Sequence, residues 1–166
     1  MDIRWRQRRL ALGALSMVSL SLVAASASAA DYATVNLSIS VDKPADVVWK
    51  KVGGYCDIAT WLKLTCVYTS GNGDLGTVRR LADRIDEVMV GKTDHSYTYT
   101  QPNATNLYHG TMQVVEDGKK KSKILYSLIY DQAPLATDEA KAKAKENYTT
   151  RFNTALESMK KLAEGG

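Results

Sequence analysis

The stretch TDEAKAKAKENYTTRFNTALESMKKLA, residues 137–163, predicts a single long amphipathic helix towards the end of the chain. Its apolar residues recur at spacings of four, four, three, four and three, which puts them on one face of a helix. They are Ala144, Tyr148, Phe152, Ala155, Met159 and Leu162. Thr137 can cap the first turn, and Gly165 can end the last. At about 1.5 Å per residue the helix would be roughly 39 Å long, enough to cross a whole sheet.

The residues ahead of this helix have the patterns of strands and short helices. Residues 35–41 carry an apolar side chain at every second position, which is typical of a half-buried first strand. A short helix is expected from Pro44 to Gly53, and a second one over residues 56–62. Six further strands are expected over residues 65–69, 76–82, 85–91, 96–101, 108–116 and 122–131. The order predicts one α+β domain, residues 31–166: a seven-stranded antiparallel sheet curled around the long C-terminal helix, with two short helices after strand 1.

Residues 1–30 have the composition of a secretory signal peptide. Four arginines precede residue 10, an apolar run covers residues 10–25, and small residues favour cleavage after Ala29 or Ala30. The run is too short and too rich in serine for a membrane anchor, so no stable membrane insertion is expected after the signal is removed. The paired arginines leave the twin-arginine export route open beside the general one. We therefore expect a periplasmic or secreted protein.

The basic charge of the chain belongs largely to this first segment. The sequence has 22 Lys and Arg against 18 Asp and Glu, and residues 1–30 hold four of the arginines and one of the aspartates. The remainder is therefore close to neutral, which argues against a nucleic-acid partner. Its length suits one core of ordinary size.

Cys56 and Cys66 are the two cysteines of the chain. In an exported protein such a pair is more often bridged than free, and the alternative is two buried thiols. His95 and His109 have no histidine or cysteine at ligand spacing, so no metal site is expected, and no cofactor.

Several local strings, taken in order, resemble the START-like helix-grip superfamily (SRPBCC), and within it the polyketide cyclase/dehydrase group. The resemblance covers about residues 33–163 and rests on the order and spacing of the strings together. They are Pro44-Ala45-Asp46-Val47-Val48-Trp49, Trp61, Gly76-Thr77-Val78-Arg79, Glu87, Ser96-Tyr97-Thr98-Tyr99 and Tyr108. The resemblance implies a hydrophobic cavity under the C-terminal helix that holds lipids, sterols, hormones or polycyclic aromatics. It implies no particular reaction.

Plant abscisic-acid receptors are similar at the same places, where the matching positions Arg79, Glu87 and Tyr108 would line or support the pocket. This chain departs from them twice. The reversal at residues 83–84 has no glycine or proline, which argues against their mobile gate. Their lysine for the ligand carboxylate falls near Leu64, which argues against recognition of an acidic hormone.

The tyrosines provide a second indication of a cavity. Nine tyrosines accompany one phenylalanine, and strand alternation puts Tyr97 with Tyr99, and Tyr108 with Met112, on the same faces. A buried phenol needs a hydrogen-bond partner, so a tyrosine-lined space suggests a wet or ligand-filled interior; the alternative is hydroxyls at the surface. The residues expected to bind a ligand are Trp61, Arg79, Glu87, Tyr97, Tyr99, Tyr108, Met112, Tyr126, Tyr148 and Phe152.

Glu87 shares a strand face with Ile85 and Met89, so its carboxylate is expected to point inward. A buried carboxylate needs a partner, and Arg79 on the neighbouring strand is the obvious one. The pair could brace the fold or offer a polar end to an apolar ligand. Glu87 could also be the general base of a cofactor-independent step.

Three functional hypotheses follow from these patterns. The first is an exported protein that binds a small hydrophobic or aromatic molecule, such as a lipid, a polyketide or an aromatic ligand. The second is a cofactor-independent cyclase, dehydratase or lyase that uses Glu87, and the third is an envelope protein with a filled core. Arg151, next to Phe152, belongs either at the pocket mouth or on a solvated flank. The sequence leaves the oligomeric state open.

Overall fold

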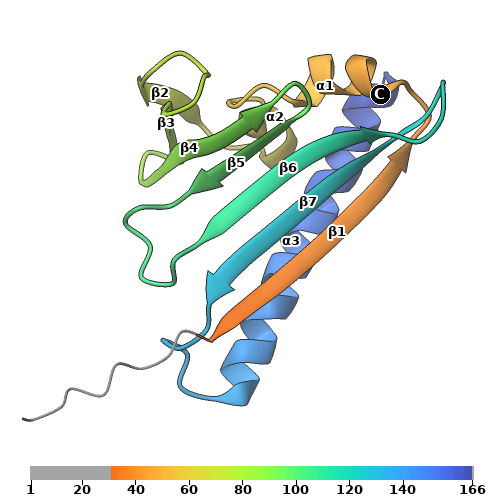
Figure 1. The fold of residues 1–166 in the computed structure, drawn as a ribbon. Coiled ribbons are helices and arrows are strands. Elements are labelled where there is room, and N and C mark those ends of the chain that lie inside the picture. The colour runs from red at the N-terminus through yellow and green to blue at the C-terminus, as the bar shows by residue number, and fades with distance from the viewer. Residues whose placement is uncertain (1–30, 166) are drawn as a thin grey trace, which may run out of the picture.

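The computed structural model describes residues 31–165, and the expected signal peptide lies outside the described residues. Within this range the chain forms seven strands and three helices (Figure 1). Their order is β1 (Tyr32–Val41), α1 (Ala45–Val52), α2 (Ile58–Leu62), β2 (Cys66–Ser70), β3 (Val78–Leu81), β4 (Ile85–Thr93), β5 (Ser96–Thr100), β6 (His109–Glu116), β7 (Ser122–Asp131) and α3 (Asp138–Glu164).

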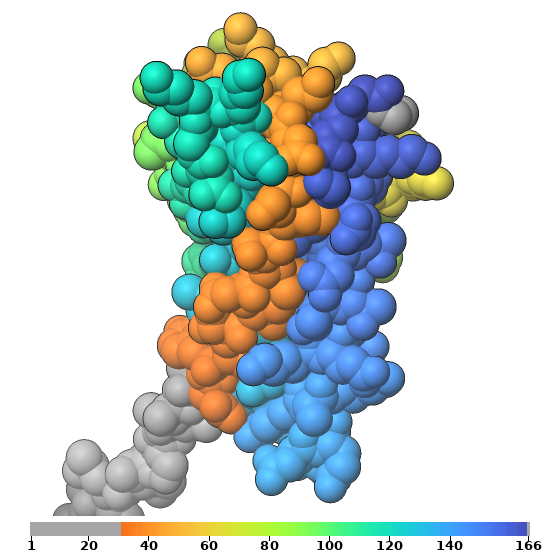
Figure 2. Space-filling view, turned by 90° about the vertical axis from the view of Figure 1, so that its right-hand side faces the viewer, coloured from red at the N-terminus to blue at the C-terminus, as the bar shows by residue number. Residues whose placement is uncertain are grey.

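The seven strands form one antiparallel sheet in the order β1-β7-β6-β5-β4-β3-β2. The first strand pairs with the last, from Tyr32 opposite Asp131 to Val41 opposite Ser122. The sheet curls around α3, which runs beside β1 along the length of the domain, as Figures 1 and 2 show from two sides. Helices α1 and α2 lie at the opposite end of the domain from the start of β1 (Figure 1). The expected helix-grip arrangement is confirmed.

Two strands begin two or more residues away from the expected position. Strand β1 begins three residues earlier than the apolar alternation indicates, because its backbone already pairs with β7 at Tyr32. Strand β3 begins at Val78 and not at Gly76, because Gly76 has a φ of 83° and belongs to the preceding turn. The pattern of apolar residues does not show where backbone pairing begins or where a left-handed turn lies.

Helix α3 has the predicted caps. The hydroxyl of Thr137 accepts a hydrogen bond from the backbone N–H of Ala140 at 3.1 Å, and Gly165 ends the helix in the left-handed conformation with φ 98°. The buried face of α3 is rotated slightly from the apolar stripe that the sequence predicts. Leu162 is only partly buried, whereas Leu156 is fully enclosed. The buried residues are Phe152, Ala155, Leu156, Met159 and Ala163.

A disulfide joins Cys56 to Cys66, whose Cα atoms are 5.6 Å apart. It links the turn before α2 to the first residue of β2.

Replacing both cysteines by serine is expected to lower the free energy of unfolding by roughly 2–3 kcal/mol, because the bridge closes a loop of about ten residues in the unfolded chain. Urea denaturation measures the difference. Reduced wild-type protein should behave like the double variant, and unchanged stability after reduction would contradict the expectation.

Candidate ligand-binding site

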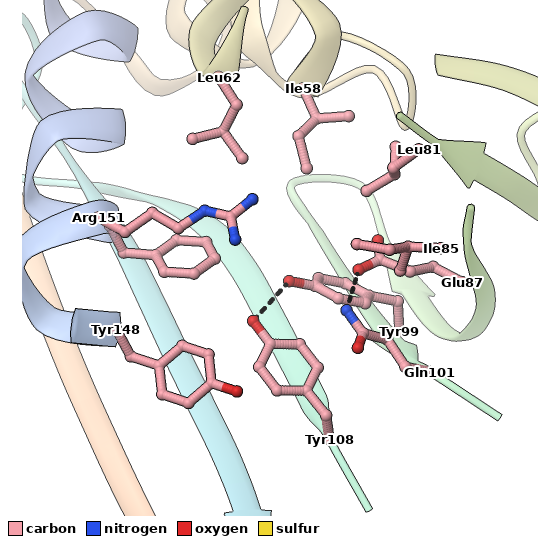
Figure 3. Close-up of a pocket in the computed structure, with 11 residues that line it drawn as sticks. Ile58, Leu62, Leu81, Ile85, Glu87, Tyr99, Gln101, Tyr108, Tyr148 and Arg151 are labelled. Atoms are coloured by element: carbon pink, nitrogen blue, oxygen red, sulfur yellow. Dashed lines mark hydrogen bonds between the residues drawn. The ribbon is translucent and has the colours of Figure 1, made fainter. Parts of the chain in front are cut away.

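A cavity of about 180 Å³ lies between α3, α2 and the β3–β6 part of the sheet (Figure 3). Helix α2 covers it with two aliphatic side chains, and α3 contributes two aromatic rings and an arginine. The β3–β4 hairpin, β5 and the connection between β5 and β6 supply the rest. The lining residues are Ile58, Leu62, Leu81, Ile85, Glu87, Tyr99, Gln101, Tyr108, Tyr148, Arg151 and Phe152. The lining is thus mixed: aliphatic and aromatic side chains meet polar groups both on the sheet side and, with Tyr148 and Arg151, on α3.

Three tyrosine hydroxyls form a buried chain beside this cavity. The Tyr99 hydroxyl lies 2.9 Å from that of Tyr126 and 3.5 Å from that of Tyr108. Burial raises the pKa of Tyr99 and of Tyr126 well above the usual value. Burial also raises the pKa of Tyr108. The phenols therefore keep their protons at neutral pH. When Tyr126 donates to Tyr99 and Tyr99 donates to Tyr108, the Tyr108 hydroxyl keeps its proton for another molecule in the cavity.

Both oxygen atoms of the Glu87 carboxylate accept hydrogen bonds from neighbouring side chains. Its Oε2 atom accepts hydrogen bonds from Nε and Nη2 of Arg79 at 2.8 and 2.6 Å. Its Oε1 atom accepts one from Nε2 of Gln101 at 2.8 Å, which Figure 3 shows at the cavity wall. The carboxylate thus accepts three hydrogen bonds, two from a guanidinium and one from an amide, and two of the three are charge-assisted.

Arg79 lies behind Glu87, away from the cavity. Its guanidinium carbon is 4.0, 5.5 and 4.9 Å from the ring centroids of Tyr55, Tyr97 and Tyr99, and it also donates to the carbonyl of Tyr55. The side chain is fully buried. Burial opposes its charge, but the surrounding Tyr97 and Glu87 raise the pKa of Arg79 above the usual value. This geometry favours a bracing role for the ion pair.

The residues predicted from sequence fall into three groups in the structure. Five line the cavity, namely Glu87, Tyr99, Tyr108, Tyr148 and Phe152. Trp61 lines a neighbouring groove on the outer side of α2 and α3. The other four, Arg79, Tyr97, Met112 and Tyr126, are buried in the packed layer around the cavity and not in its wall. Strand alternation identified the inward face correctly, but it cannot show whether an inward side chain meets space or another side chain.

Six lining residues were not predicted as site residues: Ile58, Leu62, Leu81, Ile85, Gln101 and Arg151. Three of them had a signal in the sequence. Gln101 continues the alternation of Tyr97 and Tyr99, Ile85 shares the face of Glu87, and Arg151 stands next to Phe152 on the long helix. Nothing in the sequence indicates that Ile58 and Leu62 meet these strands, since that depends on how α2 folds back over the sheet.

Gly110 has no side chain, and the Tyr99 ring occupies the space that a side chain at position 110 would fill. The two residues are cross-strand partners, and a Cβ atom at position 110 would lie 2.4 Å from Cζ and the hydroxyl of Tyr99. Gly110→Ala is expected to displace the ring and to lower the free energy of unfolding by about 1–3 kcal/mol in a denaturant titration. Gly91→Ala is the matched control, because its Cβ would only touch Thr98 at 3.4 Å. Equal effects of the two substitutions would contradict the role of Gly110.

Sequence comparison now identifies the family. The model of the family described as polyketide cyclase/dehydrase and lipid transport matches residues 32–164 of this chain. The chain belongs to this family. A comparison with curated protein sequences finds no match.

Solved structures of this fold superpose on most of the polyketide cyclase/dehydrase domain described above. A protein from Nitrosospira multiformis is 18% identical, with a TM-score of 0.66, and the match covers 78% of this chain and 96% of that chain. The Zhui aromatase/cyclase from Streptomyces sp. R1128 is 15% identical, with a TM-score of 0.66 and coverage of 81% and 94%. Norcoclaurine synthase from Thalictrum flavum, in complex with dopamine and hydroxybenzaldehyde, is 18% identical, with a TM-score of 0.58 and coverage of 80% and 87%. Identities this low establish the shared fold alone.

Two further observations concern residues 31–165. None of the helices in this range combines the length and the apolar composition that crossing a membrane requires. The same residues contain no cluster of three or more side chains suited to hold a metal ion.

Proposed function

We propose that the protein binds a small molecule with one aromatic ring in the cavity beneath α3. The observation that carries this proposal is the cavity volume of about 180 Å³. An apolar cavity of about 150 Å³ holds a benzene molecule, whereas pockets for larger ligands span roughly 300–1,000 Å³. A polycyclic polyketide or a lipid chain would need more room than this cavity offers.

The lining supports a ring with a polar substituent. The side chains of Ile58, Leu81 and Phe152 offer an apolar enclosure, while the Tyr99–Tyr108 hydroxyls offer a hydrogen-bond donor on the sheet side. The complex of norcoclaurine synthase with dopamine and hydroxybenzaldehyde shows that one member of this fold accepts small aromatic molecules.

The proposal can be tested by calorimetric titration of the purified protein with 4-hydroxybenzaldehyde, 2-naphthol and palmitate. We expect the one-ring probe to bind best. Leu62→Trp, which fills the cavity from α2, should abolish this binding, and Val47→Trp on the exposed part of α1 should not. Absence of any one-ring binding, or a preference for palmitate, would reject the proposal.

A catalytic role is the second candidate, because Glu87 is the one carboxylate among the lining residues and the family description includes cyclases and dehydrases. In this role Glu87 would be the base of a cofactor-independent cyclisation, dehydration or lyase step on an aromatic substrate. If an activity is found, Glu87→Gln should remove it. Turnover that survives this substitution would exclude Glu87 as the base.

We also propose that the protein is exported to the periplasm or secreted. The pattern of residues 1–30 and the Cys56–Cys66 disulfide support this, because disulfides persist in oxidising compartments. Intact mass measurement on fractionated cells should find a chain that begins near residue 31. A full-length chain confined to the cytoplasm would reject export.

A further inference from the structure

Arg151 lies between the cavity and a groove on the outer surface. It lines the cavity together with Leu62 and also lines an open groove of about 680 Å³ between α2 and α3. Figure 3 shows its guanidinium extending from α3 into the space between α2 and Tyr99. Arg151 therefore occupies the mouth of the cavity, one of the two positions considered from the sequence.

The guanidinium of Arg151 has no partner of its own among residues 31–165. Within residues 31–165 it makes no hydrogen bond, and no carboxylate lies within 4.0 Å of it. The side chain is exposed and lies 5.9 Å from the centroid of the Phe152 ring. By contrast, Arg79 and Arg80 on β3 each hold a carboxylate, at 2.6 and 2.7 Å. Arg151 is thus available to a group that enters from solvent.

The cavity and its mouth differ in charge. Inside, Arg79 neutralises Glu87 and burial keeps the tyrosines protonated, so the inner wall carries no net charge. At the mouth, the groove has three cationic side chains and one carboxylate, namely Lys63, Arg151, Lys161 and Glu157. A ligand with a neutral ring inside and an anionic group outside matches this arrangement.

We propose that the ligand is an aromatic acid, whose ring fills the cavity and whose carboxylate pairs with Arg151 at the mouth. This deepens the proposed function and rests on it. The sequence argued against an acidic ligand because Leu64 stands where related receptors have a lysine. In this chain the cation comes from α3 instead, and a guanidinium can hold a carboxylate through two parallel hydrogen bonds.

The test compares benzoate with benzamide, which have the same ring and differ in charge. Calorimetric titration of the purified protein should show that benzoate binds about tenfold more tightly, the difference expected for one charge-assisted hydrogen-bonded pair. Arg151→Gln should remove this preference, so that the two probes bind to the variant with equal affinity, and Arg151→Lys should keep part of it. Lys145→Gln removes one positive charge from an exposed position of the same helix and is the matched control. This variant should still bind benzoate more tightly than benzamide.

The outcomes separate this inference from the proposed function. Equal affinities for benzoate and benzamide in the wild-type protein, or a benzoate preference that persists in Arg151→Gln, would overturn the role of Arg151 while one-ring binding stands. Absence of binding by both probes would overturn the proposed function and the inference together.

Discussion

Arg79→Met is expected to lower the free energy of unfolding by about 3–5 kcal/mol, because it leaves the buried carboxylate of Glu87 without a countercharge. Only 2% of Glu87 is exposed, and Gln101 would remain as its one side-chain partner. Methionine keeps much of the length of the arginine side chain. The loss of stability therefore measures the contribution of the charge and its hydrogen bonds more than the contribution of packing. Urea denaturation, followed by circular dichroism, measures the change.

The neighbouring Arg80 offers a matched control within the same pair of strands. Arg80 pairs with Asp86 at 2.7 Å, but 44% and 21% of these two side chains are exposed. Arg80→Met should therefore cost only about 0–1 kcal/mol. The double substitution Arg79→Met with Glu87→Leu should recover part of the loss, because no charge is left buried. If Arg79→Met costs no more than Arg80→Met, the buried pair does not brace the sheet.

This ion pair also shows what sequence reasoning could predict. The alternation in β3 and β4 places Arg79 and Glu87 on inward faces, and the short hairpin between them makes them direct cross-strand partners. The same two-residue period predicted the burial of Tyr97, Tyr99, Tyr108 and Tyr126, all of which are at most 3% exposed. The two-residue period of the strands therefore predicted the buried side chains correctly.

The cavity itself depends on features that no single element contains. Its volume is set by the distance between α3 and the curled sheet, and by the way α2 places Ile58 and Leu62 over the β3–β4 hairpin. Tyr99 reaches the cavity whereas Tyr97, on the same face two residues earlier, packs against Arg79. The sequence shows that Arg151 is next to Phe152 on the helix, but only the fold shows that the Arg151 side chain lies at the mouth of the cavity.

Phe152→Ala is expected to lower the free energy of unfolding by about 3–5 kcal/mol, because it removes a large buried side chain that packs between α3 and the sheet. The Phe152 ring is 3% exposed, and its centroid lies 4.5 Å from that of Tyr126. Denaturant titration measures the loss. Asn153→Ala, at the next and exposed position of the helix, should have little effect and serves as the control.

The same substitution should also change which ligands fit. Because Phe152 forms part of the cavity wall, the space it vacates joins the existing cavity and does not form a separate void. A two-ring probe such as 2-naphthol should then bind to Phe152→Ala and raise its melting temperature, since a ligand that binds only the folded state stabilises it by mass action. The wild-type protein should show no such shift. If both proteins respond alike to 2-naphthol, Phe152 does not limit the size of the ligand, and the proposed restriction to a single ring loses its structural basis.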